Sequence, residues 1–329
     1  MSRHLFARLV FAGLVAGATL LGAASSAAQA QDYPSRPVKI IVPFGAGGPA
    51  DVYARVLAQY LGETLKQPFV VENRPGAGSI IGTDAVAKSD PDGYTLLLMS
   101  NTHTVNETLT PNKPFKLMSD FVAVAPINYS DLMMVVHPSV SAKDVKEFVA
   151  LAKSKPGGLN YASSGPGTPY HMAGELFKAM SGTDIQHIPH KASGEARNAV
   201  LGGHVQMMFD AVTTMSNSAK AGQVKALATT GAKRSELTPD VPTVSESGVP
   251  GYEATIWLGL MAPAKTPQPI IDKLNAEIAK VINRPDVKEA WAKQGAVPMV
   301  MSPQEFDAFL RKDVDKWADV VKKTGASAN

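Results

Sequence analysis

Apolar residues along the first third of the chain alternate between the spacing of strands and the spacing of helices. Short β-rich runs predict strands at 38–42, 69–71 and 94–99, and helical spacing predicts helices at 49–66 and 79–88. This β-α-β-α-β order predicts a mostly parallel sheet with helices on both of its faces.

The same alternation continues through the middle of the chain, and the C-terminal part is helical. Further strands are predicted at 159–162, 185–188, 205–209 and 224–228, with helices at 168–180 and 195–201. Apolar stripes at helical spacing predict two C-terminal helices, within 270–278 and 306–321. An α/β fold follows, and a chain of this size is expected to divide into two lobes.

The N-terminal segment is a different kind of sequence. Arg3 and Arg8 precede an apolar run at 9–21, and Ala28-Gln29-Ala30 supplies the small-x-small pattern of a cleavage site. This layout predicts a secretory signal peptide, residues 1–30, cleaved after Ala30. The apolar run is shorter than the roughly 20 residues that a membrane anchor needs, so we expect an exported protein of the bacterial periplasm.

Composition and charge narrow the classes of function. With 45% apolar and 19% charged residues, the composition is globular, which excludes disorder, collagen and coiled coil. The absence of Cys excludes disulfides, thiolate zinc sites, iron–sulfur clusters and a cysteine nucleophile. The net charge of +3 falls to +1 without residues 1–30, which hold two of the 32 Lys and Arg and none of the 29 Asp and Glu. No basic run stands out, so no nucleic-acid partner is expected.

A glycine-rich turn at 43–51 connects the first strand to the first helix and is the first candidate site. Its glycines let the backbone approach a ligand, and the helix start offers unpaired N–H groups, so the turn predicts an anion site. A tight turn without a ligand is the alternative. The loose dinucleotide pattern Gly45-x-Gly47-x-x-Ala50 is disfavoured because Pro43 interrupts the junction, and no cofactor is expected. We expect Asp51 to cap the turn or to orient water.

A second turn of the same kind, at 163–171, also lies between a strand and a helix. Thr168 is a natural N-cap, and Pro169 suits the first helical position. If the two turns face each other across a cleft, they could hold the two ends of a dicarboxylate; two unrelated turns are the alternative. A third glycine-rich segment, at 73–79, precedes a helix and is expected to flank the same cleft.

Enzyme and metal interpretations find little support. Ser163, Ser164, His171 and Asp210 suggest a hydrolase, but the chain has no Gly-x-Ser-x-Gly elbow around these serines. His187 and His190 are three apart in an extended segment, so we expect them on opposite faces and predict no metal site. Asp210 ends an apolar strand and could accept hydrogen bonds from a ligand or hold a loop. His171 is either a ligand contact or a packing residue.

With these residues together, the chain resembles the substrate-binding proteins of tripartite tricarboxylate transporters, the Bug family. The resemblance covers essentially the whole chain after the expected signal peptide. It rests on an ordered set of short runs at 33–37, 41–48, 72–78, 90–96, 163–168 with His171, 209–210, 240–244, 248–252 and Trp257. Each run alone is weak, but the ordered set is specific.

The resemblance implies a two-lobed periplasmic binding protein of type II, with a central cleft and a hinge. With the order of elements, it suggests crossovers at 128–132 and 251–257. The first lobe is then expected to comprise 31–128 and 254–329, and the second lobe 129–253. Proteins of this family bind citrate, dicarboxylates, acidic amino acids, nicotinate or aromatic diacids such as terephthalate, and they dock on a two-component integral membrane transporter.

The two turns and the resemblance together predict the ligand contacts. They are Phe44, Ala46, Gly47, Gly48, Gly78, Ser79, Ser163, Ser164, Gly165, Gly167, Thr168, His171, His190 and Asp210. His190 stands where the family often has Tyr, so the ligand's carbon skeleton cannot be carried over. We expect a monomer without catalytic residues that binds a small carboxylate, preferably a dicarboxylate, aliphatic or aromatic. The alternatives are a sensor that signals to a membrane receptor and a secreted hydrolase.

Overall fold

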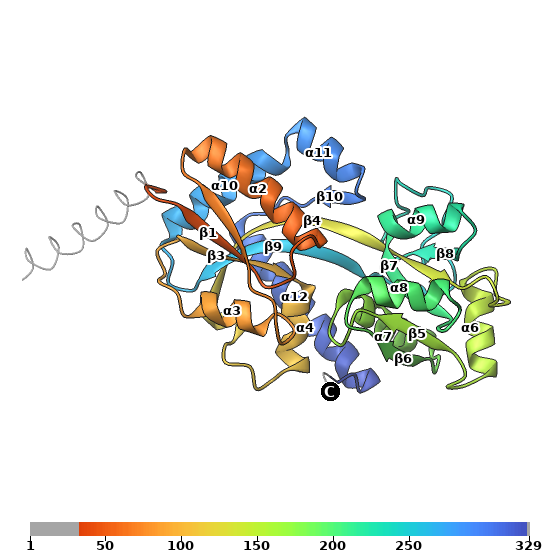
Figure 1. Ribbon diagram of the computed structural model, residues 1–329. Helices are drawn as coiled ribbons and strands as arrows, with labels where there is room; N and C mark the ends of the chain where they lie inside the picture. Colours follow the sequence, from red (N-terminus) through yellow and green to blue (C-terminus); the bar gives the residue numbers. More distant parts are fainter. Residues whose placement is uncertain (1–32, 328–329) are drawn as a thin grey trace, which may run out of the picture.

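The computed structural model describes residues 33–327 (Figure 1), and the expected signal peptide lies outside them. The strands are β1 (Val38–Val42), β2 (Phe69–Asn73), β3 (Thr95–Ser100), β4 (Phe121–Val136), β5 (Asn160–Ser163), β6 (Gln186–Pro189), β7 (Met207–Ala211), β8 (Lys225–Thr229), β9 (Thr255–Pro263) and β10 (Ala296–Pro298). The helices are α2 (Pro49–Leu65), α3 (Ile80–Ala87), α4 (Asn101–Leu109), α5 (Leu117–Asp120), α6 (Val145–Ser154), α7 (Pro169–Ser181), α8 (Ser193–Leu201), α9 (Val212–Lys220), α10 (Gln268–Ile282), α11 (Pro285–Ala292) and α12 (Pro303–Thr324). Strands and helices alternate along most of the chain, which confirms the predicted α/β class.

β4 joins the two halves of the molecule (Figure 1). Its first part, through Asp131, pairs antiparallel with β9, and its last part pairs antiparallel with β7 from Leu132 and with β8 from Met133. The strands at both outer ends of the sheet are parallel: β1 pairs in parallel with β2 and β3, and β5 pairs in parallel with β6 and β7. We call the half with β1, β2, β3 and β9 the first lobe and the half with β5, β6, β7 and β8 the second lobe.

The predicted parallel pairing is thus confirmed at both ends of the molecule but not at its centre. The centre is antiparallel because the chain enters the second lobe through β4 and returns into β9, which pairs with both β3 and β4. The order of elements predicts the crossover, but it does not reveal that β4 continues through it as one strand.

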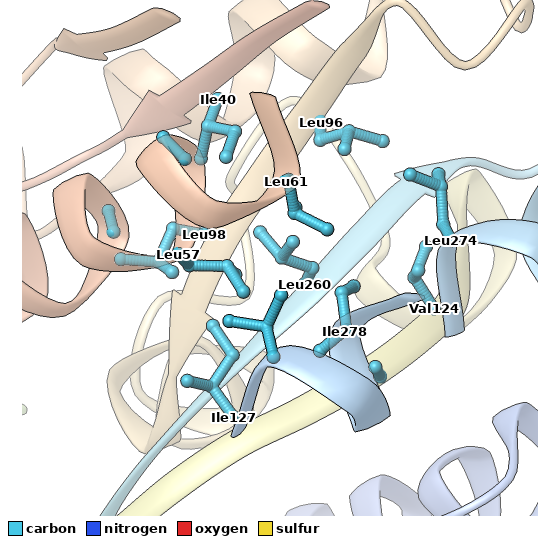
Figure 2. Close-up of a cluster of buried hydrophobic side chains, with 14 of the residues drawn as sticks. Ile40, Leu57, Leu61, Leu96, Leu98, Val124, Ile127, Leu260, Leu274 and Ile278 are labelled. Atoms are coloured by element: carbon cyan, nitrogen blue, oxygen red, sulfur yellow. The ribbon is translucent and has the colours of Figure 1, made fainter. Parts of the chain in front are cut away.

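The core of the first lobe forms where α2 and α10 cover the sheet (Figure 2). Leu57 and Leu61 lie about one turn apart on α2 and are fully buried in one cluster with Ile40 and Leu98 of the sheet. α10 adds Leu274 to the same cluster. Burial of each such side chain contributes roughly 1.5–3 kcal/mol, so this packing fixes where the start of α2 lies.

The C-terminal helix α12 packs on both lobes. Phe306 and Leu310, near its start, are buried with Trp257 of β9, whereas Trp317, further along, is buried in the second-lobe cluster with Phe177 of α7. α12 therefore links the lobes in addition to β4 and β9. The residue boundaries of the lobes stay a prediction: the pairing of β4 changes within the expected crossover, but the end of α12 packs on the second lobe.

Candidate functional site

A cavity of about 500 Å³ lies between the two lobes. The first lobe lines it with the 44–50 turn, the start of α4, and residues of β4 and β9 such as Asn128 and Leu258. The second lobe lines it with the starts of α7, α8 and α9. The cavity is therefore built from both lobes, as a site that closes around a ligand requires.

The starts of five helices converge on this cavity. Their N-cap residues all line it: Gly48 of α2, Ser100 of α4, Thr168 of α7, Ala192 of α8 and Ala211 of α9. The first turns of α2, α8 and α9 receive no hydrogen bond from a capping side chain. Unpaired N–H groups and the positive ends of helix dipoles favour a bound anion. Among the described lining residues, Lys191 is the one cationic side chain.

The turn at the start of α2 is held by the side chain of Asp51. Its Oδ2 accepts a hydrogen bond from the Gly47 N–H at 2.9 Å and another from Arg55 Nε at 3.1 Å. Asn73 supports the same turn, because its Nδ2 donates to the Phe44 carbonyl at 3.1 Å. The hydrogen bond from Arg55 is the main reason why the pKa of Asp51 is lowered. Asp51 therefore caps the turn, which is one of the two roles that the sequence suggested.

The turn before α7 is held by buried polar contacts. Ser163 Oγ lies 2.6 Å from His187 Nε2 and accepts the Gly165 N–H at 3.1 Å. Thr168 caps α7 as predicted: its Oγ1 accepts the His171 N–H at 3.4 Å and donates to the Gly165 carbonyl at 2.7 Å. Gly165 has φ +111°, a conformation that favours glycine.

Two histidines, the buried His171 and the half-buried His187, stack beneath this turn. The ring centroids of His171 and His187 lie 4.0 Å apart, and Tyr161 stacks on His187 at 4.9 Å. His171 Nδ1 accepts the Gly167 N–H at 3.0 Å, which assigns the proton of the neutral ring to Nε2. Burial lowers the pKa of His171 to about 4 and the pKa of His187 to about 3. Both rings are therefore neutral at pH 7 and hold the turn from behind.

Asp210 and His190 lie near the cavity but outside its lining. The Asp210 carboxylate accepts hydrogen bonds from Arg197 Nε at 2.9 Å and from the Ala211 N–H at 2.8 Å. Burial raises the pKa of Asp210, and Arg197 opposes that shift. Asp210 thus connects α8 to the start of α9, so it holds a loop. His190 Nδ1 lies 3.1 Å from the Ile188 carbonyl oxygen.

The third glycine-rich segment packs against α4. The Gly78 carbonyl accepts a hydrogen bond from Asn106 Nδ2 at 2.8 Å. Ser79 has φ +79° and is buried, and its Oγ has no hydrogen-bond partner among the described residues. Neither Gly78 nor Ser79 lines the cavity.

Of the predicted ligand contacts, five line the cavity: Phe44, Ala46, Gly48, Ser164 and Thr168. The other nine, all described residues, lie outside its lining: Gly47, Gly78, Ser79, Ser163, Gly165, Gly167, His171, His190 and Asp210. A helix was predicted at 195–201, but the predicted ligand contacts did not include the starts of α8 and α9. They also lacked a row of polar residues in the first lobe, Ser100, Thr102, Asn128 and Ser130. Their signal is weak, because these residues follow or lie within strands and form no motif.

The lobes touch on two sides of the cavity. A Cβ at Gly167 of the second lobe would lie 2.9 Å from Leu109 Cδ2 of α4. A Cβ at Gly295, just before β10, would lie 2.9 Å from Leu237 Cδ1 and 3.1 Å from Thr213 Cγ2. Glycines at these two positions therefore allow the close approach of the two lobes.

No group of three or more His, Asp or Glu side chains within residues 33–327 is placed to hold a metal ion. In the same range, none of the helices combines the length and the apolar character needed to cross a membrane. The lining residues offer hydroxyl, amide and main-chain groups around an apolar wall that includes Phe44 and Leu258. Such a lining is typical of a site that binds a small molecule.

Two α/β lobes that enclose a cavity lined by helix starts define the class of periplasmic solute-binding proteins. Residues 53–326 match the family model of the "Tripartite tricarboxylate transporter family receptor". The chain belongs to this family, which confirms the resemblance seen in the sequence.

Individual relatives agree with this assignment. Protein BugT of Bordetella pertussis is 40% identical over 299 residues, which cover 90% of this chain and 92% of that protein. A Rhodopseudomonas palustris protein solved with adipate has a TM-score of 0.81 at 32% identity, covering 90% of this chain and 99% of that one. MatC of the same species, solved with malate, has a TM-score of 0.77 at 31% identity, and the match covers 88% of this chain and 100% of MatC. These structures confirm the predicted two-lobed fold class.

Proposed function

We propose that this protein captures a small carboxylate between its lobes and delivers it to a two-component integral membrane transporter. The convergence of five helix starts on one cavity carries the proposal, because it offers main-chain donors from both lobes. A dicarboxylate fits best, with one carboxylate at α2 and α4 and the other at α7, α8 and α9. The relatives solved with adipate and malate support this ligand class.

Binding proceeds by closure of the lobes. A ligand that bridges both lobes stabilises the closed state by contacts that the open state cannot make. We propose that the moving units are 31–128 with 254–329 and 129–253. The change of pairing along β4 between Asp131 and Leu132 supports this division.

The remaining assignments follow from the same proposal. Phe44, Ala46, Gly48, Ser164 and Thr168 contact the ligand, and the protein acts as a monomer in the periplasm after cleavage behind Ala30. Membership of a receptor family supports a binding function without catalysis. Of the two candidate serines of a hydrolase, Ser163 is fully buried and lies against His187. Ser164 lines the cavity, but the candidate base His171 does not, and its Nδ1 accepts the Gly167 N–H.

A thermal-shift screen tests the proposal. The panel contains mono-, di- and tricarboxylates, acidic amino acids, nicotinate and phthalate isomers near neutral pH. A ligand at about 100 times its Kd stabilises the native state by roughly 2.7 kcal/mol, so a selective rise in Tm with one dicarboxylate is expected. No shift with any carboxylate, in protein shown to be free of co-purified ligand, would contradict the proposal.

Uptake separates transport from sensing. A strain that lacks the gene should lose uptake of the ligand found in the screen, and the intact gene should restore it. Normal uptake combined with a lost transcriptional response to the ligand would favour a sensor that signals to a membrane receptor.

A further inference from the structure

The first-lobe side of the cavity carries a row of uncharged polar side chains that carboxylate binding at helix starts does not require. Ser100 and Thr102 lie at the start of α4, and Asn128 and Ser130 lie on β4. Ser100 is occupied as a cap, because its Oγ accepts the Thr102 N–H at 3.2 Å. Asn128 has no comparable role.

The pairing of β4 with β9 places the Asn128 side chain on the cavity face. Asn128 lies opposite Leu258, and Ser130 lies opposite Ile256, and all four residues line the cavity. Tyr129, between them, packs against the core on the opposite face of the sheet. Since successive side chains of a strand point to opposite faces, Asn128 and Ser130 share the face that the ligand would contact.

The amide nitrogen of Asn128, Nδ2, is buried without a protein partner among the described residues. The residue is 2% exposed, and its Nδ2 has no hydrogen-bond partner among the described residues. Buried amides in native proteins are nearly always paired, so an unpaired one at the wall of a binding cavity calls for a partner from a ligand or from water. A carboxamide can turn over, so either its donor or its acceptor can face the cavity.

We propose that Asn128 determines specificity by hydrogen bonding to a hydroxyl group on the ligand's carbon skeleton, so that the preferred ligand is a hydroxylated dicarboxylate. This inference rests on the proposed function. A hydroxyl both donates and accepts hydrogen bonds, which matches the NH2 donor and the carbonyl acceptor of the Asn128 amide. The Ser130 hydroxyl lies on the same face of β4 as Asn128. An unsubstituted diacid would leave the buried amide unpaired and is therefore disfavoured.

The charges around the cavity favour a hydroxyl over an ammonium group. An ammonium group would call for a carboxylate that faces the ligand. Asp131 is the one acidic residue among the described lining residues, and its Oδ1 also lacks a hydrogen-bond partner there. Its carboxylate packs against Gly231, however, where a Cβ would lie 2.5 Å from Oδ1. Because this carboxylate is directed at Gly231, the group that we expect beside the ligand's carbon skeleton is the uncharged amide of Asn128. An uncharged hydroxyl on the ligand suits that amide better than an ammonium group does.

Isothermal titration calorimetry on matched ligand pairs tests the inference, with protein produced from the full coding sequence. The pairs are succinate and malate, glutarate and 2-hydroxyglutarate, and adipate and 2-hydroxyadipate, so chain length is controlled. At the length that binds best, the hydroxylated member should bind about 10- to 100-fold more tightly, as expected for one buried polar group that gains a partner. Asn128→Ala should bring the two affinities to within about threefold of each other.

Asn101→Ala is the matched control. Asn101 is also 2% exposed, but its Nδ2 donates to the Thr255 carbonyl at 3.2 Å and the residue does not line the cavity. This variant should keep the wild-type ratio of affinities even where it lowers Tm. Asn128→Ser supplies the same comparison should Asn128→Ala not fold, and its ratio should also fall below that of the wild type.

The outcomes separate this inference from the proposed function. If both members of a pair bind the wild type within about threefold, or if the Asn128 variants keep the wild-type ratio, the inference is overturned while carboxylate binding stands. Tighter binding of the 2-amino analogue than of the 2-hydroxy analogue would overturn the hydroxyl assignment. If no carboxylate binds at all, the proposed function itself fails.

Discussion

At the scale of single residues, the cavity depends on side chains that lie behind its wall. Asp51 accepts a hydrogen bond from the Gly47 N–H, and His171 accepts one from the Gly167 N–H. The turn before α2 and the turn before α7 are thus each fixed from behind by one buried polar group. Asp210 does the same for Ala211 at the start of α9. The turns are therefore arranged before a ligand arrives, which reduces the entropy lost on binding.

Asp51→Asn tests this support. The change removes the charge that both the Gly47 N–H and Arg55 use, so we expect a loss of roughly 1–3 kcal/mol of stability and weaker ligand binding. Urea denaturation and calorimetry measure the two effects. Asp307→Asn is the control, because Asp307 forms an exposed ion pair with Arg311 at 2.8 Å that is expected to contribute about 0–1 kcal/mol. Equal losses in the two variants would argue against a special role for Asp51.

Two glycines of the same turn separate backbone strain from steric clash. A Cβ at Gly45 or at Gly47 would meet no atom within 4 Å, but only Gly47 of the two has a positive φ, +78°. Gly47→Ala should therefore cost about 1–2 kcal/mol, whereas Gly45→Ala should leave unfolding in urea without ligand nearly unchanged. Similar midpoints for the two variants would show that the turn relaxes without strain.

At the scale of elements, the helix starts that sequence could predict are those with a visible signal. α2 and α7 each begin with Pro after a glycine-rich turn, at Pro49 and Pro169, and both were predicted. α4 follows β3 without a loop, since Ser100 is both the last strand residue and the N-cap. α9 begins after Ala211 without a capping side chain. Neither junction has a glycine-rich turn or a Pro at the helix start, and the Ser100 cap lies within a strand, so tertiary packing rather than a visible motif places these two helix starts.

The same limit applies to individual side chains of the site. Glycine, Ser and Thr at a helix start have a local reason to be there, so Gly48, Ser164 and Thr168 could be predicted as lining residues. Asn128 sits in the middle of a long strand, where no local pattern distinguishes a cavity residue from one in the core. Its position follows from register with β9, which depends on how the two lobes are joined.

The packing of α12 on both lobes leads to a prediction about the stability of the folded protein. Trp317 is 2% exposed, and its Nε1 donates to Asp313 Oδ2 at 3.2 Å. Trp317→Ala should cost about 3–5 kcal/mol, because it opens a cavity in the second-lobe core on a helix that also packs on the first lobe. Val314→Ala, at a half-buried position one turn earlier, should cost much less. Unfolding followed by both circular dichroism and fluorescence would measure the losses, and a Trp317→Ala loss below about 1 kcal/mol would exclude this linking role.

At the scale of the whole molecule, three histidines are neutral at pH 7: His103 and His171 are buried, and His187 is half-buried. Burial lowers the pKa of His103 to about 4, of His171 to about 4 and of His187 to about 3. His103 lies behind the first-lobe turn, with its ring 5.9 Å from Phe44. The turn before α2 in the first lobe and the turn before α7 in the second lobe thus both pack against imidazole rings that are uncharged at neutral pH.

Stability should consequently fall in mild acid. A histidine in the unfolded chain has a pKa of about 6.5, so between that pH and about 4 the unfolded state binds more protons than the folded state. The free energy of unfolding should decrease as pH falls from 7.5 to 5, before most carboxylates titrate. Urea midpoints across this range measure the slope, and His187→Phe, which keeps a ring in the stack, should reduce it. Asp131 opposes this trend, because burial raises its pKa to about 6. A profile that is flat and that His187→Phe leaves unchanged would contradict the neutral form of these rings.

The use of helix starts as donors has a consequence for how such a protein can change over time. Every residue except proline carries a main-chain N–H whatever its side chain, so few substitutions can delete the groups at the starts of α2, α8 or α9 that we propose bind the carboxylates. Side chains on the strands between them, by contrast, are free to vary. The architecture thus separates what all ligands share from what distinguishes them, and it allows new selectivity to arise one residue at a time while affinity for the shared group persists.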